Sequence, residues 1–442
     1  MNDYRPVSIL PVMSKIFERV VMKQIVSFID KEQLLYERVC GYRKGHSTVT
    51  ALLGIKDMIM QAMGKGEITL MVLADFSKAF DTIDYKTLIH KMHALHFSNC
   101  FLKWLLSYLD DRYQFVQVDD KASELKLTTF GVPQGSILGP VLFNLYVTDL
   151  QDKIQLPCFQ YADDTTILAH GRPKDLPSLE TALNEDLEKL ISWSSSTNLA
   201  LNPKKTKVMV MSTNQLSKKH SLQSYSPVLK IGAKHLEREH CSKLLGVTLN
   251  EHLSWDDHIA KVTSSCFSTM SILRKFRNLM PFKLKRQVAE LLVLSKMDYA
   301  DAIFRPLPLR LLKRLQKVQN AAASFVLGRY AKEKDVITLG WLPMKERRDW
   351  HLMKLSFKYL SDRHKPEYID ISLKEHTRNL RSNSAPLIAT STSTSNIFRN
   401  DAAELFNKLP AEIRNTKSSA QFSSQTRNIL KIAAAERLLV WI

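Results

Sequence analysis

Three features that would assign this chain to a membrane, secreted or disulfide-bonded class are missing from its 442 residues. No apolar run approaches the roughly 18 residues that a membrane-spanning helix needs, and the polar start "MNDYRP" does not have the pattern of a signal peptide. The five cysteines are scattered and form no CxxC or Cys/His cluster, which argues against a zinc knuckle and a disulfide framework. We therefore expect an intracellular protein of a reducing compartment, nucleus or cytoplasm.

Acidic residues are scarce relative to basic ones. The 44 Asp and Glu residues face 63 Lys and Arg residues, which gives a formal net charge of +19. Such an excess favours a polyanionic partner, and without an apolar span we expect nucleic acid rather than a membrane surface. At 45% hydrophobic residues the chain can form an ordinary globular core, and its length suggests about two or three domains.

The apolar pattern predicts a mixed α/β part followed by a helical part. Helices are expected after Pro11, over 49–63, 85–109 and 137–150, and along "LETALNEDLEKLISWSS". The run "EITLMVLADF" is typical of a strand buried on both faces. "QFVQVDDKASELKLTTF" and "CFQYADDTTILAH" are expected to form hairpins, and "CSKLLGVTLN" a single strand. From Trp255 onward nearly all signals are helical, apart from a Ser/Thr-rich loop over 382–395.

Three carboxylates in the α/β part are candidates for a metal site. Asp75 ends the buried strand, and Asp163 and Asp164 lie between the two apolar halves of a hairpin. Carboxylates that converge from separate strands repel one another unless a divalent cation neutralises them. We expect the hairpin to hold Asp163 opposite Asp75. The alternative, a strand-end cap and an ordinary turn, is about equally good on these stretches alone.

Four segments around these carboxylates resemble a known family. "ADFSKAFDTIDY", "GVPQGSILGPVLFNLYVTDL", "YADD" and "LNPKKTK" follow one another in this order. They resemble motifs A, B, C and D of reverse transcriptases, specifically those of non-LTR (LINE-type) retrotransposons of the jockey and chicken-repeat type. The flanking "NDYRPVSILPVMSKIFERVV", "CGYRKGHSTVTAL" and "SKLLGVTLNEHLSWDDHI" look like fingers and primer-grip segments of the same family.

The resemblance implies an α+β right-hand polymerase fold. Fingers and a palm with an antiparallel sheet would occupy 1–250, a basic helical thumb 251–335, and a helical extension 336–442. The activity implied is RNA-directed DNA polymerisation, with an RNA template, a DNA primer and deoxynucleoside triphosphates as partners. The oligomeric state does not follow from the sequence.

Within the family, Asp75, Asp163 and, more replaceably, Asp164 would bind two Mg²⁺ ions, with Mn²⁺ as an alternative. Lys205 would act as a general acid toward pyrophosphate, or only as a nearby charge. A solvated lysine in a basic turn is an equally good interpretation of Lys205.

The resemblance also implies substrate contacts. Phe80 would exclude a ribose 2′-OH by its bulk, although a phenylalanine in this position is more often simply part of the core. The loop with Gly131, Gln134 and Gly135 would let the backbone approach the nascent base pair, or would serve as a helix start capped by Ser136. Arg5 and, more weakly, Arg43 would contact the triphosphate or the template.

The predicted thumb is strongly basic. Between Arg274 and Lys317 the acids are only Glu290, Asp298 and Asp301. We expect this surface to contact the phosphates of the template and primer, although it could also serve solubility alone.

The chain departs from full-length elements of this family. It is expected to be truncated at its N-terminus, because the family's fingers begin before "YRP", and to lack the upstream endonuclease. Two rival hypotheses remain: a truncated remnant that only binds nucleic acid, and an RNA-dependent RNA polymerase. Phe80, and Ala162 where a glycine would precede the Asp pair, argue against the latter.

Overall fold

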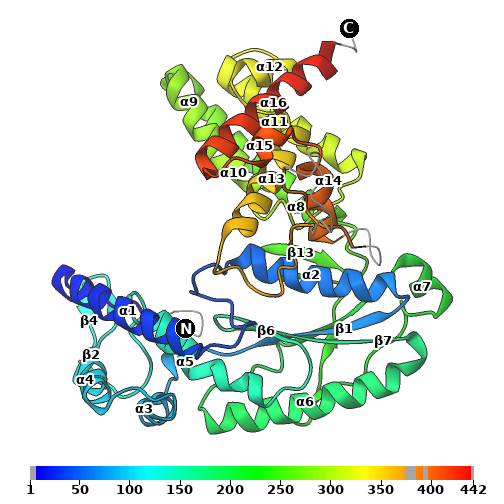
Figure 1. Cartoon of the computed structure of the whole chain (residues 1–442). Coiled ribbons are helices and arrows are strands. Elements are labelled where there is room, and N and C mark those ends of the chain that lie inside the picture. The colour runs from blue at the N-terminus through cyan, green and yellow to red at the C-terminus, as the bar shows by residue number, and fades with distance from the viewer. Residues whose placement is uncertain (1–5, 375–384, 392–396, 440–442) are drawn as a thin grey trace. The chain divides into compact units, whose positions relative to one another are not determined.

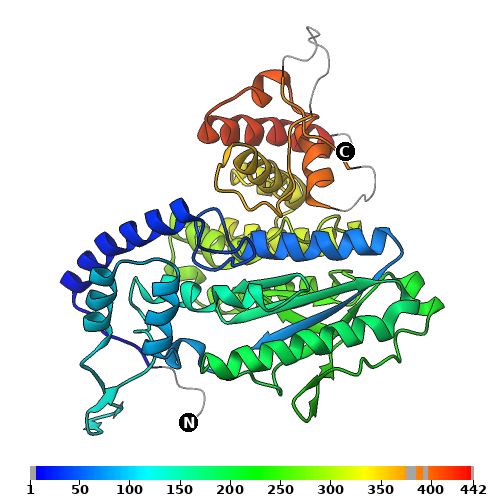
Figure 2. The same cartoon turned by 60° about the horizontal axis from the view of Figure 1, so that its bottom comes forward.

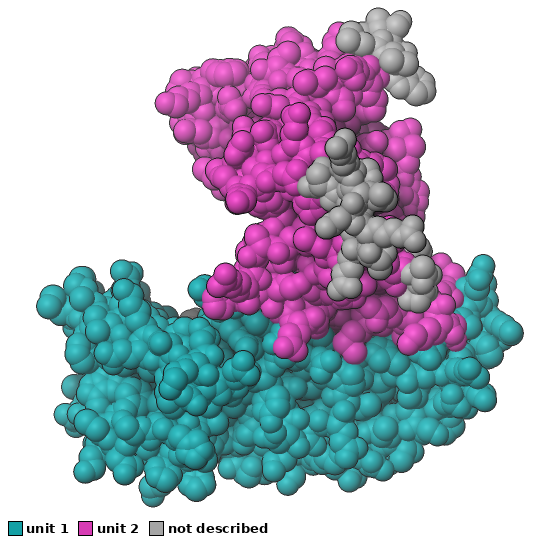
Figure 3. Space-filling view, in the orientation of Figure 1, with its two compact units in different colours: residues 1–51, 67–210, 215–239 teal, residues 52–66, 211–214, 240–442 magenta. Residues whose placement is uncertain are grey.

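The computed structural model describes residues 6–374, 385–391 and 397–439, which form two compact units (Figures 1 and 3). Unit 1 comprises residues 1–51, 67–210 and 215–239, and unit 2 comprises residues 52–66, 211–214 and 240–442. The predicted boundaries at residues 250 and 335 stay a prediction. Arg5 and half of the predicted loop over 382–395 lie outside the described residues.

Unit 1 is built on a sheet of five strands in the order β11-β8-β1-β7-β6. Its central strand β1 is the apolar run predicted from the sequence, and Ile68, Leu70, Met71 and Val72 in it are fully buried. β7 pairs with β1 and β6 in antiparallel register, as predicted, and the short edge strand β11 runs parallel to β8. The strands are β1 (Ile68–Asp75), β6 (Cys158–Tyr161), β7 (Asp164–Gly171), β8 (Lys207–Met211) and β11 (Glu237–Arg238).

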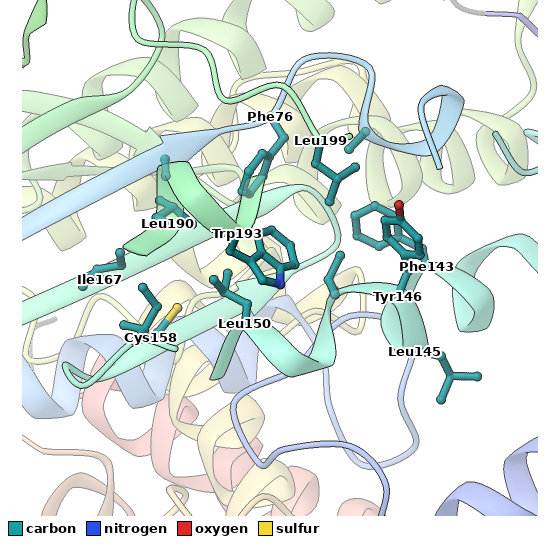
Figure 4. Packing of buried hydrophobic residues seen from close by; sticks show 14 of the residues in the cluster. Phe76, Phe143, Leu145, Tyr146, Leu150, Cys158, Ile167, Leu190, Trp193 and Leu199 are labelled. Carbon is teal, nitrogen blue, oxygen red and sulfur yellow. The ribbon is translucent and has the colours of Figure 1, made fainter. Parts of the chain in front are cut away.

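The core of unit 1 lies between this sheet and its helices (Figure 4). α6 runs along one face of the sheet (Figure 2), and its Trp193 meets Phe76 edge to face at a centroid distance of 6.1 Å. The helices are α1 (Val12–Glu32), α3 (Tyr85–Ala94), α4 (Asn99–Leu109), α5 (Gly139–Val147), α6 (Leu176–Ser196) and the short η1 (Ala79–Asp81), η2 (Thr148–Asp152) and η3 (Pro173–Asp175).

Small hairpins complete unit 1. The polar segment after α4 forms two antiparallel pairs, β2 with β5 and β3 with β4, as its sequence predicted. The bounds are β2 (Arg112–Gln114), β3 (Gln117–Val118), β4 (Lys121–Ala122), β5 (Lys126–Thr128), β9 (Lys230–Ile231) and β10 (Lys234–His235). Helices α2 (Thr48–Gly64) and α7 (Asn214–Lys219) each have residues in both units.

The segment of unit 2 that starts at His240 begins with a hairpin where the sequence had suggested one strand. "CSKLLGVTLN" folds into β12 (Cys241–Leu244) and β13 (Val247–Asn250), which pair in antiparallel register. The single-strand prediction was wrong because Leu245 and Gly246 both have a positive φ, 45° and 84°. A two-residue turn of this kind reverses the chain. It usually has Asn, Asp or Gly in its first position, so the apolar Leu245 gave no sign of a turn.

The rest of unit 2 is almost entirely helical, as predicted. A single bridge between Leu373 and Ile388 is its only pairing beyond β12 and β13 among the described residues. No helix of the described ranges has the length and apolar character to cross a membrane. The elements are α8 (Asp256–Lys275), η4 (Arg277–Leu279), α9 (Phe282–Ala289), η5 (Glu290–Leu294), α10 (Ser295–Asp298), α11 (Leu309–Leu327), α12 (Glu333–Thr338), α13 (Met344–Ser361), α14 (Phe398–Phe406), α15 (Ala411–Arg414) and α16 (Ser419–Leu439).

Candidate active site

The sheet of unit 1 brings the three candidate carboxylates together. Asp75 is the last residue of β1 and Asp164 is the first residue of β7, and the two are direct partners in the antiparallel register. Asp163 lies with Ala162 in the two-residue turn that joins β6 to β7. The expected position of Asp163 opposite Asp75 is therefore wrong by one residue: the strand partner is Asp164, and Asp163 is at the tip of the turn.

The electrostatics of these residues fit a cation site. The pKa of the Asp164 carboxyl is raised to about 6, first by its partial burial and then by the negative charges of Asp163 and Asp75. Burial, and then the charge of Asp163, raise the pKa of Tyr42 as well. Mutual repulsion of this kind is relieved by a bound divalent cation, and carboxylate oxygens are the ligands that Mg²⁺ prefers. The three residues therefore fit the metal site that their sequence context implied.

The loop before α2 packs against the turn that contains Asp163. The Cys40 N–H donates to the Gln160 carbonyl at 2.7 Å, which joins this loop to the edge of β6. Gly41 lies so close that a Cβ atom there would be 2.8 Å from the backbone nitrogen of Ala162. The buried Asn144 on α5 donates to the Gly41 carbonyl at 2.6 Å. Position 41 thus needs a glycine because of space, and Asn144 holds it in place.

The turn that carries Lys205 is attached to the backbone of Asp75. The Asn202 N–H donates to the Asp75 carbonyl at 2.8 Å, and the Asp75 N–H donates to the Thr206 hydroxyl at 3.4 Å. Lys205 itself is exposed. The structure therefore brings the backbone of this turn to the carboxylate site, while the role of the Lys205 side chain stays a prediction.

Phe80 lies at the edge of the apolar core. Its ring stacks on Phe143 of α5 with a centroid distance of 4.3 Å and meets Tyr42 edge to face at 6.4 Å. The side chain is partly buried, so it packs against the core and still presents surface. Both interpretations of Phe80 from the sequence are compatible with this position.

The loop with Gln134 packs against η1 and against the segment around Ser8. Gln134 donates from Nε2 to Asp81 of η1 at 2.7 Å. Gly131 has a φ of +85°, and a Cβ there would be 2.8 Å from the Asp81 backbone. Gly135, with a φ of +107°, would bring a Cβ to 3.2 Å from the Ser8 carbonyl oxygen. These glycines are required by folding, whatever the loop also binds.

The remaining predicted residues have structural partners or fall outside the described ranges. Arg43 donates from Nη1 to the Tyr36 carbonyl at 2.8 Å, so one edge of its guanidinium is occupied. Ser136 accepts from the Gly139 N–H at 2.9 Å, but it is not the N-cap that the sequence suggested, because α5 begins two residues later than expected and Leu138 occupies the N-cap position. The position of Arg5 is not described.

Glu18 on α1 is a buried residue that the sequence interpretation missed. Its carboxylate accepts from the Ile137 N–H at 2.6 Å and from the Tyr108 hydroxyl at 3.1 Å. Through these hydrogen bonds Glu18 connects α1 to α4 and to the segment before α5. A signal was present: Glu18 precedes Val21 and Ile25 by three and seven residues, which puts a charged residue on the buried face of the helix.

A second group of ligand-type side chains lies in unit 2. Ligand atoms of Asp298, Asp301 and His351 are all within 4.8 Å of one another. However, Arg347 donates to Asp298 from Nε at 2.6 Å and also from Nη2, and His351 contacts Asp301 at 2.7 Å. These contacts describe an ion-pair network, so this group is a poor match for a cation site.

Known proteins are similar in sequence to this chain. The family described as "Reverse transcriptase (RNA-dependent DNA polymerase)" matches residues 1–249. The probable RNA-directed DNA polymerase from transposon BS of Drosophila melanogaster is 29% identical over 335 residues, covering 73% of this chain and 36% of that protein. The RNA-directed DNA polymerase from mobile element jockey of the same species is 26% identical over 270 residues, covering 59% and 28%. The chain thus spans about a third of the length of these relatives.

A solved structure is also similar. Telomerase from Candida tropicalis, in complex with the TWJ fragment of telomeric RNA, aligns with 81% of this chain and 56% of its own, at 11% identity and a TM-score of 0.39. The family match covers more than half of the chain, includes all three carboxylates and agrees with the α+β fold predicted from the motifs. The chain belongs to the reverse transcriptase family.

Proposed function

We propose that this chain is an RNA-directed DNA polymerase of a non-LTR retrotransposon, acting on an RNA template, a DNA primer and deoxynucleoside triphosphates. The observation that carries the proposal is the pairing of Asp75 with Asp164 beside the turn residue Asp163. In the reaction the primer 3′-OH loses its proton to water and attacks the α-phosphate, a new P–O bond forms, and pyrophosphate leaves with the electrons of the P–O bond that breaks.

The three carboxylates would hold two divalent cations, Mg²⁺ or alternatively Mn²⁺. Bound there, such ions would stabilise negative charge on the attacking and leaving oxygens. The raised pKa of Asp164 supports this assignment, because after burial its causes are the charges of Asp163 and Asp75. Asp163 and Asp75 are the residues on which the proposal depends most.

Other side chains would orient the substrates. The partly exposed ring of Phe80, held by its stack on Phe143, would exclude a ribose 2′-OH. Lys205 would donate a proton to the leaving pyrophosphate, and its turn is attached to the Asp75 backbone. Gln134, Gly135 and Arg43, together with Arg5, would contact the incoming nucleotide.

Primer extension tests the proposal. The purified chain receives an RNA template, a labelled DNA primer, deoxynucleotides and Mg²⁺, beside an Asp163→Asn variant and an Asp175→Asn control. Asp175 lies in η3, outside the candidate site. We expect extension by the parent and the control, and loss of extension in Asp163→Asn. A parent that binds template–primer without extending it would leave the remnant hypothesis, and extension by Asp163→Asn would refute the site.

A further inference from the structure

Two cationic side chains in the C-terminal helices of unit 2 meet at one indole ring. Lys354 of α13 places Nζ 4.2 Å from the centroid of the Trp350 ring, and the guanidinium carbon of Arg427 of α16 lies 5.4 Å from it. The ring is fixed, because Trp350 Nε1 donates to the Ser423 carbonyl at 2.9 Å. Cations over an indole face are attracted by the negative charge of its π-system, so the ring holds both side chains in place.

The acidic residues around this ring already have basic partners: Asp298 pairs with Arg347, Asp301 with His351, and Glu290 with Arg286. No ion pair within 4.0 Å is found for Lys354 or Arg427 among the parts of the chain that the structure describes. The pKa of Lys354 is lowered by burial first and then by the charges of Arg427 and Arg347, and the charges of Asp298 and Asp301 offset only part of this. An anion at this position would relieve that repulsion.

Arg427 also lies near a basic residue of α9, Arg286. Arg427 donates from Nη2 to the Gly340 carbonyl at 2.9 Å, and Nη2 of Arg286 would be 3.6 Å from a Cβ at Gly340. Arg286 belongs to a stretch without acids: between Asp257 and Glu290 there are seven Lys and Arg residues and no Asp or Glu. Arg427 of α16 and Arg286 of α9 therefore both lie close to Gly340.

We propose that Lys354 and Arg427 together bind a backbone phosphate of single-stranded RNA, so that the C-terminal helices are part of the nucleic-acid-binding surface. A guanidinium presents paired donors that match phosphate oxygens, and a lysine adds a point charge. A contact to a backbone phosphate reads no base edge, so this binding would be independent of sequence. The choice of RNA as the polyanion rests on the proposed function. The site itself does not include the carboxylates Asp75, Asp163 and Asp164.

Fluorescence anisotropy with a labelled single-stranded RNA, measured over a series of salt concentrations, tests this site in the full chain. Each phosphate contact contributes about 0.7 to the slope of log K against log salt for a single strand. Lys354→Gln with Arg427→Gln removes the contact to one phosphate and should lower the slope by about 0.7, which corresponds to about 5-fold weaker binding near 0.1 M salt. Lys354→Arg with Arg427→Lys keeps both charges and should bind like the parent.

Two exposed lysines of α7 provide the matched control. Lys218→Gln with Lys219→Gln removes the same charge from another part of the chain, and should leave slope and affinity within about twofold of the parent. An unchanged slope in the Lys354/Arg427 variant overturns the proposal. Equal weakening in the control variant also overturns it, because the effect would then be one of net charge.

Two further results separate this inference from its alternatives. Poly-glutamate of equal charge should compete more weakly than RNA, and equal competition would overturn the assignment to phosphate. RNA should change the fluorescence of Trp350, seen as the difference between the parent and Trp350→Phe, and this readout applies even where the double variant does not fold. A parent that binds no RNA at all would instead refute the proposed function.

Discussion

A methyl group at position 41 should disturb the candidate active site without touching any predicted metal ligand. In Gly41→Ala the new Cβ would be 2.8 Å from the Ala162 nitrogen, about 0.6 Å closer than the ordinary contact of 3.4 Å. The obstacle is backbone, and Asn144 and the Cys40–Gln160 hydrogen bond restrain the loop on the other side. The turn that carries Asp163 therefore has to move.

The size of the effect follows from that displacement. Overpacking of this kind costs about 1–3 kcal/mol of stability, which lowers Tm by roughly 2–4 °C per kcal/mol for a domain of about 150–250 residues. A misplacement approaching 1 Å costs up to about 100-fold in rate, so we expect extension to fall by about 10- to 100-fold.

Single-turnover primer extension and thermal unfolding measure the two consequences. Gly171→Ala on β7 is the matched control, because its Cβ would meet only the flexible side chain of Leu179, at 3.1 Å. The control should keep rate and Tm close to those of the parent. Full activity and an unchanged Tm in Gly41→Ala would refute the inference that this contact positions the turn.

Three other changes test further parts of the structure. Glu18→Ala leaves the Ile137 N–H without its acceptor and should cost about 1–3 kcal/mol, whereas Tyr108→Phe should cost less; urea unfolding compares them, and equal losses would contradict this ranking. Burial, then the charge of Arg348, lowers the pKa of His258 to about 4. The unfolded chain takes up a proton on His258 below about pH 6.5, whereas the folded chain does so only near pH 4. The free energy of unfolding is therefore largest above pH 6.5 and falls by roughly 3 kcal/mol as the pH drops to 4. His258→Gln should flatten the stability profile between pH 6.5 and 4, and an unchanged profile would contradict the assignment. Phe80→Ala should increase incorporation of ribonucleotides relative to deoxynucleotides in single-nucleotide extension, and an unchanged ratio would exclude Phe80 as the discriminating residue.

Much of the candidate site could be predicted because its signals are local in sequence. The buried strand ending at Asp75 and the hairpin around Asp163 and Asp164 each follow from a short run of apolar residues and its interruption. The same reasoning failed at Leu245 and Gly246, where a left-handed turn has an apolar residue in its first position. Local patterns also could not decide which member of the Asp pair faces Asp75, because that depends on the length of the turn.

The sequence by itself determined the α+β class, the order of the motifs and the identity of the three carboxylates, because each rests on residues that are neighbours in the chain. Only the tertiary structure decided that Asp164 is the strand partner of Asp75 and that Gly41 packs against the turn at Ala162. The same is true of the bond from Ile137 to Glu18, which joins residues 119 positions apart. Such contacts depend on how separate elements pack, and no periodicity within either element specifies its partner.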